Sequence, residues 1–175
     1  MAELRGRYLA FLDADDLWVE GKLARQLERM AETGAAIVHG SYRFVDESGA
    51  FLRGGVKASD RVDLVTYMGN TEIGMSTALV DLGQVGAFRF RDIRLCQDTH
   101  LWLELLRRGF VARGLPQVLT LYRVREGQIS GSKLGMSRQV LSLYLEIGEL
   151  SWARRLWSFA SYACNGVRKR VVSPS

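Results

Sequence analysis

The chain has 175 residues, of which 47% are apolar and 25% charged, as expected for one globular domain with a substantial core. Two cysteines, Cys96 and Cys164, are too few for a disulfide framework, so a reducing cytoplasm is the expected setting. The net charge of +5 comes wholly from residues 151–175, because residues 1–150 carry 19 basic and 19 acidic side chains. A neutral body argues against nucleic acid as a partner and leaves the basic tail as the candidate for an anionic surface.

An apolar run from Tyr8 to Leu12 ends in three carboxylates, Asp13, Asp15 and Asp16. The run predicts a strand buried on both faces, as in a parallel α/β sheet, and such sheets bind ligands at the carboxyl ends of their strands. Carboxylates this close repel one another unless a cation relieves them, and Mg²⁺ or Mn²⁺ prefers oxygen ligands together with phosphates. The cluster therefore predicts a metal–phosphate site.

Three other interpretations of this cluster compete with a metal–phosphate site. Asp at a strand end is often a turn former, and Asp16 could cap the following helix. An EF-hand loop from Asp13 would need Gly and Glu where the chain has Trp18 and Ala24, so it is excluded. A phosphatase of the haloacid dehalogenase type also carries Asp-x-Asp after a strand but expects Thr or Val where Leu17 stands, so it fits less well.

The following segments alternate between helical and extended patterns. Leu23, Leu27 and Met30 recur at helical spacing, and Gly34 ends that helix. The expected elements are a helix over 19–32, a strand over 35–40 that continues extended to 46, a hairpin partner over 50–53, a polar loop over 54–60, a helix over 62–68, a strand over 76–80, an extended segment over 88–95, a helix from 98 to 108, strands over 110–112 and 118–124, and a polar loop over 126–133.

Asp98 opens the helix whose apolar face carries Leu101, Trp102, Leu105 and Leu106. Two interpretations of this carboxylate are open. It could be an N-cap, or it could face a cleft and act as a general base.

The C-terminal region shows apolar residues at helical spacing and basic residues beside and beyond them. The apolar run over 156–167 is too short to span a bilayer, which needs about 20 residues. An interfacial helix on anionic lipid is one interpretation, and a helix that packs its stripe on the domain or on a missing region is the other. The apolar stripe is Trp152, Leu156, Phe159, Ala163 and Val167, with Arg154 and Arg155 off it and Arg168, Lys169 and Arg170 beyond it.

Together these pieces resemble the family 2 glycosyltransferases of the GT-A fold, over about residues 5–133. The resemblance looks closest to bacterial transferases that build cell-surface polysaccharides. Its three motifs read here as Tyr8 to Trp18 followed by Lys22-Leu23 and Gln26, as Gln97-Asp98 followed by Leu101-Trp102, and as Tyr122-Arg123 followed by Ser130 and Ser132.

The resemblance implies an α/β fold with a partial GT-A (Rossmann-like) mixed sheet flanked by helices over 1–133. The apolar spacing and basic residues beyond it predict a basic amphipathic helical tail over 134–175. The resemblance also implies a nucleotide-sugar donor, a glycan or lipid-linked acceptor, and a divalent metal, Mg or Mn. In the roles that it implies, Asp15 with Asp13 binds the metal, Asp13 and Asp16 contact the donor, Asp98 is the base for inverting transfer, and Arg123, Ser130 and Ser132 lie near the diphosphate.

Two departures from the family pattern shape our expectations. Gln97 replaces the usual Glu, and the family's first half, with its base pocket, would precede Met1. We therefore expect an incomplete donor site and an exposed apolar edge at the Phe11 strand, prone to self-association or to pairing with an N-terminal half. The competing interpretation is a non-catalytic truncated or split module that binds an acceptor, a partner chain or the inner face of the cell membrane.

Overall fold

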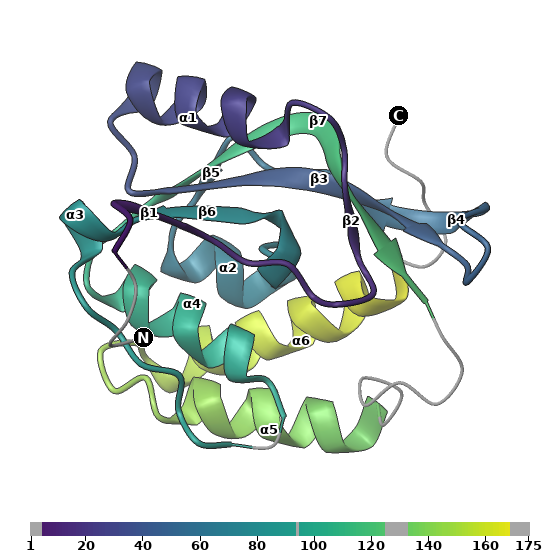
Figure 1. The fold of residues 1–175 in the computed structure, drawn as a ribbon. Helices are drawn as coiled ribbons and strands as arrows, with labels where there is room; N and C mark the ends of the chain where they lie inside the picture. Colours follow the sequence, from purple (N-terminus) through teal and green to yellow (C-terminus); the bar gives the residue numbers. More distant parts are fainter. Residues whose placement is uncertain (1–4, 94, 125–132, 169–175) are drawn as a thin grey trace.

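The computed structural model describes residues 5–93, 95–124 and 133–168, and it places a mixed sheet between helices (Figure 1). Helix α1 covers one face of the sheet, and α2 and α4 cover the other, with α5 and α6 beyond them. The strands are β1 (Tyr8–Ala10), β2 (Leu17–Trp18), β3 (Ile37–Val45), β4 (Phe51–Val56), β5 (Arg61–Val62), β6 (Ala78–Asp81) and β7 (Ala112–Arg123). The helices are α1 (Lys22–Thr33), α2 (Leu64–Asn70), the 3₁₀ turn η1 (Met75–Thr77), α3 (Leu82–Val85), α4 (Gln97–Arg107), α5 (Lys133–Leu145) and α6 (Trp152–Arg168).

The strand order is β1-β6-β3-β7-β2, with β4 paired to β3 and β5 paired to β7. The central strands β3 and β7 are parallel, and the other pairings between described strands are antiparallel. This confirms the expected mixed sheet flanked by helices. The expected division of the chain at residue 133 stays a prediction.

The prediction that the first strand is buried on both faces is wrong. Strand β1 lies at one end of the strand order and pairs antiparallel with β6. Tyr8 is 41% exposed, and Leu9 and Ala10 are half-buried. An apolar run does not indicate whether its strand lies in the middle of a sheet or at its edge, where fewer neighbouring elements cover the side chains. The exposure of Tyr8 at the edge could therefore not be predicted from the sequence.

Other elements differ from their predicted bounds. The two strands expected around 110–124 form the single strand β7, whose pairing with β3 shifts register near Gly40 and Ser41. Strand β4 extends to Val56, into the expected loop, and pairs with β3 through Tyr42↔Val56 and Val45↔Phe51, so the predicted hairpin is confirmed. Residues 88–93 form no strand.

Helix α1 ends where Gly34 was expected to end it, with Gly34 at φ 66° and its N–H donating to the Met30 carbonyl. The buried face of α1 differs from the apolar spacing. Leu23 and Leu27 are 38% and 39% exposed, while Lys22, Gln26 and Met30 are buried. Hydrogen bonds of the Gln26 amide to the sheet and to η1, described below, explain why a polar face is turned inward.

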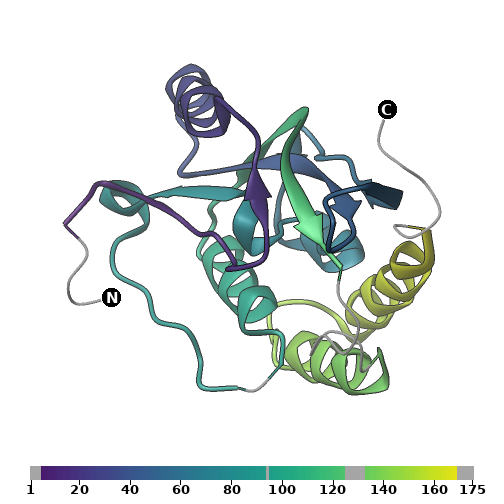
Figure 2. The ribbon, with the colours of Figure 1, turned by 45° about the vertical axis from the view of Figure 1, so that its right-hand side comes forward.

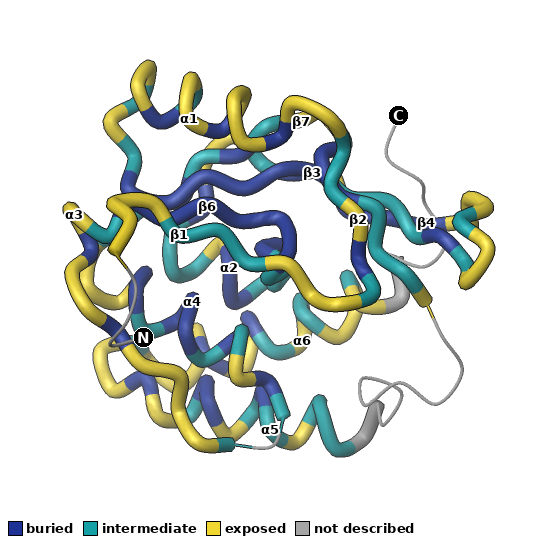
Figure 3. Tube along the Cα trace, in the orientation of Figure 1, coloured by how far each residue is buried: buried dark blue, intermediate teal, exposed yellow. Residues whose placement is uncertain are grey.

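The main core lies between the sheet and helices α2, α4 and α5, and it includes the fully buried side chains of Tyr67, Trp102 and Tyr144. Figure 3 shows β3 and β6 as buried along most of their length. Turned by 45°, α5 and α6 lie side by side below the sheet (Figure 2). Phe159 and Tyr162 of α6 pack against this same core. None of the helices over the described ranges is long and apolar enough to cross a membrane.

Candidate active site

Ser76, in the turn η1, holds the carboxylate loop that follows β1. Its hydroxyl accepts a hydrogen bond from the Asp13 backbone N–H at 3.0 Å. Its carbonyl accepts from Trp18 Nε1 at 2.9 Å and from the Thr120 hydroxyl at 3.2 Å. The loop is thereby fixed at its start and just after its end, which limits where the three carboxylates can lie.

Asp16 and Arg123 close the other side of the loop. The Arg123 backbone N–H donates to Asp16 Oδ1 at 3.1 Å, and Arg123 Nε donates to the Asp15 carbonyl at 2.9 Å. Asp16 is 5% exposed, and its Oδ2 has no hydrogen-bond partner among the described residues. The alternative that Asp16 caps the next helix is wrong, because Gly21 occupies the N-cap position of α1.

The Arg123 guanidinium also donates to the carbonyls of Asp46 and Glu47 at the β3–β4 turn. In this structure the side chain therefore ties the carboxylate loop to that turn. Its expected place near a diphosphate stays a prediction. Ser130 and Ser132, expected beside it, lie outside the described residues.

Asp98 reaches the same region from α4. It lies in the first turn of this helix, with Cys96 at the N-cap position, so the N-cap alternative is wrong. One turn further on, Trp102 contacts Phe11 edge to face, with ring centroids 6.3 Å apart. Phe11 stands two residues before Asp13, so this contact draws the loop toward the start of α4.

The carboxylates influence one another electrostatically. Burial raises the pKa of Asp13, and the charge of Asp15 raises it further. Burial also raises the pKa of Asp16 and of Asp98, and the charge of Asp13 adds to both shifts. Such shifts in a cluster of acids are typical of functional sites.

Two tyrosines complete the surroundings of the carboxylates. Burial, together with the charges of the four acidic residues, raises the pKa of Tyr122 to about 12. Tyr42 lies against Tyr122, with ring centroids 6.0 Å apart, and burial raises its pKa as well. Sequence reasoning assigned no role to Ser76 or Tyr42, because each reaches the site from a distant strand or turn that carries no local motif.

The polar contacts of α1 support the same site from the face of the sheet that this helix covers (Figure 1). Lys22 Nζ lies 4.4 Å from the centre of the Trp18 ring and donates to Gln26 Oε1 at 2.7 Å. Gln26 Nε2 donates to the carbonyls of Thr77 at 2.8 Å and Val38 at 3.2 Å. These hydrogen bonds join α1 to both η1 and β3, and η1 also carries Ser76, which binds the carboxylate loop.

No group of three or more His, Cys, Asp or Glu side chains within the described ranges is arranged to hold a metal ion. Mg²⁺ is commonly held by one or two carboxylates together with phosphate oxygens of a substrate. The pair Asp13 and Asp15 fits that smaller donor set, since the negative charge of Asp15 raises the pKa of Asp13 and a bound cation would relieve that repulsion.

Comparison with known proteins assigns the class. Residues 1–95 match the family model for glycosyl transferase family 2, and the chain belongs to this family. Over 167 residues it is 36% identical to the putative teichuronic acid biosynthesis glycosyltransferase TuaG of Bacillus subtilis (strain 168), an alignment that covers 95% of this chain and 66% of that protein.

A second relative is the Escherichia coli enzyme WfaP, described as UDP-Glc:alpha-D-GlcNAc-diphosphoundecaprenol beta-1,3-glucosyltransferase. The chain is 30% identical to it over 169 residues, which cover 97% of this chain and 66% of WfaP. The chain thus spans about two thirds of the length of these relatives.

Among solved structures, S. aureus TarS 1–349 in complex with UDP-GlcNAc matches with a TM-score of 0.61 at 14% identity. The match covers 95% of this chain and 50% of that one. At this level of identity the likeness concerns the fold alone, and it confirms the expected GT-A type of α/β architecture.

Proposed function

We propose that this chain acts in the transfer of a sugar from a nucleotide-sugar donor to an acceptor hydroxyl during synthesis of a cell-surface polysaccharide. The observation that carries the proposal is the convergence of Asp13, Asp15 and Asp16 with Asp98, from two elements far apart in sequence. Family membership and the described substrates of relatives support it. By analogy with WfaP, the acceptor class is a sugar linked through diphosphate to a lipid, and the donor is a UDP-sugar.

Asp98 is assigned as the catalytic base of an inverting transfer. Its carboxylate takes the proton of the acceptor hydroxyl, while the acceptor oxygen forms a bond to the anomeric carbon. The bond from that carbon to the phosphate oxygen breaks, and the nucleoside diphosphate leaves. The raised pKa of Asp98 favours proton uptake.

Asp13 and Asp15 are assigned as the residues that hold a divalent cation, Mg²⁺ or Mn²⁺. When bound, the cation neutralises charge on the diphosphate. The buried Asp16 holds the backbone of Arg123 and, through it, the loop that carries these ligands.

Substitution of Asp98 tests the assignment of the base. In the longest natural polypeptide that contains these residues, Asp98→Asn is expected to lower turnover by a factor on the order of 10² or more, with donor affinity unchanged. The assay follows release of UDP from UDP-glucose in the presence of a GlcNAc-diphosphate lipid. Asp92→Asn, on an exposed loop, is the matched control. Wild-type turnover in Asp98→Asn would show that Asp98 is only a helix residue.

Calorimetric titration tests the metal assignment independently. Mn²⁺ is titrated into the protein with and without UDP, and Asp15→Ala is expected to weaken binding by at least about tenfold, because removal of a ligand typically costs that much or more. The same Asp92→Asn variant serves as the control. Equal Mn²⁺ affinity in the wild type and in Asp15→Ala would reject the assignment.

A further inference from the structure

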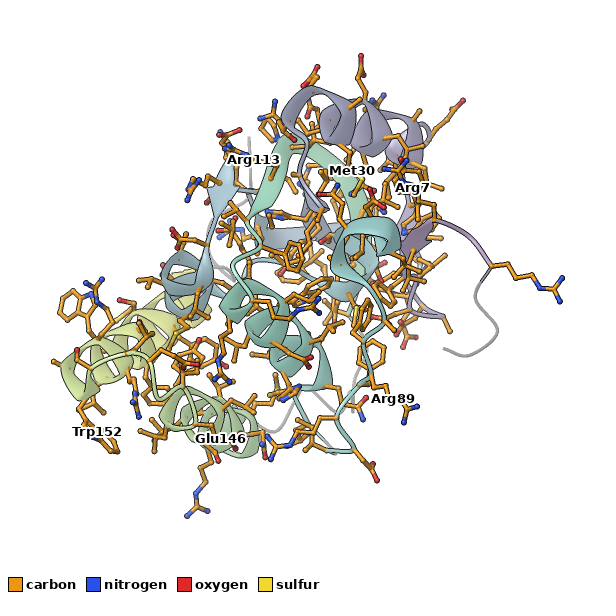
Figure 4. The ribbon with its side chains drawn as sticks, turned by 90° about the vertical axis from the view of Figure 1, so that its left-hand side faces the viewer. Arg7, Met30, Arg89, Arg113, Glu146 and Trp152 are labelled. Atoms are coloured by element: carbon orange, nitrogen blue, oxygen red, sulfur yellow. The ribbon has the colours of Figure 1, made fainter. Side chains whose placement is uncertain are left out.

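The outward surface of α6 is almost wholly apolar. Trp152, Leu156 and Trp157 are 63%, 54% and 72% exposed. Small residues fill the rest of this surface. Figure 4 shows Trp152 at the outer end of the helix. We call these side chains the α6 outer face; they are Trp152, Ala153, Leu156, Trp157, Ala160, Ala163 and Cys164, all exposed.

The opposite side of α6 is already occupied. Phe159 and Tyr162 pack on the core, Ser158 is buried, and Asn165 Nδ2 donates to the Gly69 carbonyl of α2 at 3.0 Å. The stripe expected from sequence is therefore divided, because Phe159 faces the core while Trp152 and Leu156 face outward. The sequence alternative of packing on the domain describes only the inner side of this helix.

The charges around the α6 outer face have one sign. Among the α6 side chains that the structure describes, Arg154 is the one that is both charged and exposed. Arg155 is buried and donates to the carbonyls of Leu150 at 2.8 Å and Leu145 at 2.9 Å. Residues 151–175 contain no Asp or Glu and add Arg168, Lys169 and Arg170 in sequence.

Nearby acidic residues are engaged elsewhere. Glu146 pairs with Arg91 at 2.7 Å, and Glu149 pairs with Arg107. Since residues 151–175 contain no Asp or Glu, no acidic side chain of α6 offsets its basic residues.

We propose that the α6 outer face binds the surface of an anionic lipid bilayer, with the helix lying in the interface. Tryptophan is enriched at membrane–water interfaces, and an amphipathic helix with basic flanks binds there through apolar burial and attraction to acidic headgroups. A second copy of the chain suits this face less well, because a two-fold contact would bring the basic residues of both copies together. The proposal stands independently of the proposed function.

Vesicle flotation with the purified chain tests this proposal. We expect binding to vesicles containing phosphatidylglycerol, and much weaker binding to pure phosphatidylcholine. The double variant Trp152→Ser, Trp157→Ser is expected to bind at least about tenfold more weakly, since it removes two large apolar groups from the interface. Phe51→Ser, which removes an aromatic ring that is 59% exposed on β4, is the matched control and should leave binding unchanged.

Arg154→Gln tests the charge component of the same binding. We expect it to weaken binding to anionic vesicles about fivefold, with Arg53→Gln on the exposed part of β4 as its control. Circular dichroism checks that each variant is folded. Equal binding to both vesicle types, or full binding by the tryptophan double variant, would overturn the proposal. Self-association that the same double variant abolishes, without lipid binding, would identify a second copy as the occupant instead.

Discussion

Lys22 is a buried cation with an aromatic ring and an amide as its neighbours. Burial lowers its pKa from 10.5 to about 8. Lys22 is 2% exposed, and its hydrogen-bond partner Gln26 is fully buried. Such a group stabilises local geometry at the cost of desolvating a charge, so its contribution to stability depends on pH.

The sign of that dependence is fixed by the direction of the shift. Below about pH 8, Lys22 is charged in both the folded and the unfolded state, and the desolvation cost is fully present. Between about 8 and 10.5 the folded state releases the proton first, so folding becomes more favourable as pH rises.

We therefore predict that the free energy of unfolding of the wild type, relative to Lys22→Met, rises by up to about 3 kcal/mol over this window. Urea denaturation at several pH values measures it, with the exposed Lys57→Met as the control. A difference that stays constant from pH 7 to 10.5 would contradict the prediction.

At the scale of elements, close packing of backbones decides how the strands meet. Gly114 lies in β7 where the chain before β5 crosses it, and its N–H donates to the Asp60 carbonyl at 3.1 Å. A Cβ added to Gly114 would lie 2.1 Å from the Ser59 carbonyl oxygen. This contact is with backbone, so a side chain cannot simply rotate away from it.

Gly114→Ala is therefore predicted to lower the free energy of unfolding by about 2–3 kcal/mol, the cost of overpacking at a rigid contact. Gly148→Ala is the matched control, because a Cβ there meets nothing within 4 Å. Its effect should stay within about 0.5 kcal/mol. Thermal or denaturant unfolding compares the two variants, and equal stabilities would show that the strands separate easily at Gly114.

At the scale of the whole molecule, strand β1 presents an open edge. Tyr8 is 41% and Leu12 50% exposed, and among the strands that the structure describes β6 is the one that pairs with β1. Exposed apolar edges tend to pair with other chains. A separate groove of about 630 Å³ lies beside α1. It is lined by residues of α1, of β7 and of the segment before β5, and none of them belongs to the carboxylate loop.

We predict that the polypeptide of residues 1–175 self-associates through β1, binds UDP with a dissociation constant weaker than about 1 mM, and transfers no measurable sugar. Light scattering over a range of concentrations, with Tyr8→Lys expected to reduce association, measures the first part. Leu27→Lys, on exposed α1 surface, is its control. A monodisperse chain that turns over UDP-sugar would contradict this prediction. Absence of transfer in the longest natural polypeptide as well would favour the non-catalytic interaction module.

Much of the architecture was accessible from local sequence. The prediction that α1 ends at Gly34 is confirmed. Glycine adopts the left-handed conformation that commonly ends a helix, so this end can be recognised from the sequence alone. The β3–β4 hairpin was predicted from its turn residues. The family motifs led to the expectation of a mixed sheet and a GT-A type of fold, which the structure and the comparisons confirm.

For the candidate active site, too, some features could be predicted from local sequence and others depend on the tertiary structure. Local sequence determined that Asp13, Asp15 and Asp16 share a loop and that Asp98 begins a helix, since each depends on neighbours a few residues away. Only the tertiary structure decided that these groups meet, that Ser76 holds their loop, and that α1 buries Lys22 and Gln26 in place of its leucines. Those outcomes depend on contacts between segments far apart in sequence, such as that of Asp13 with Ser76, 63 residues away, which no local periodicity encodes.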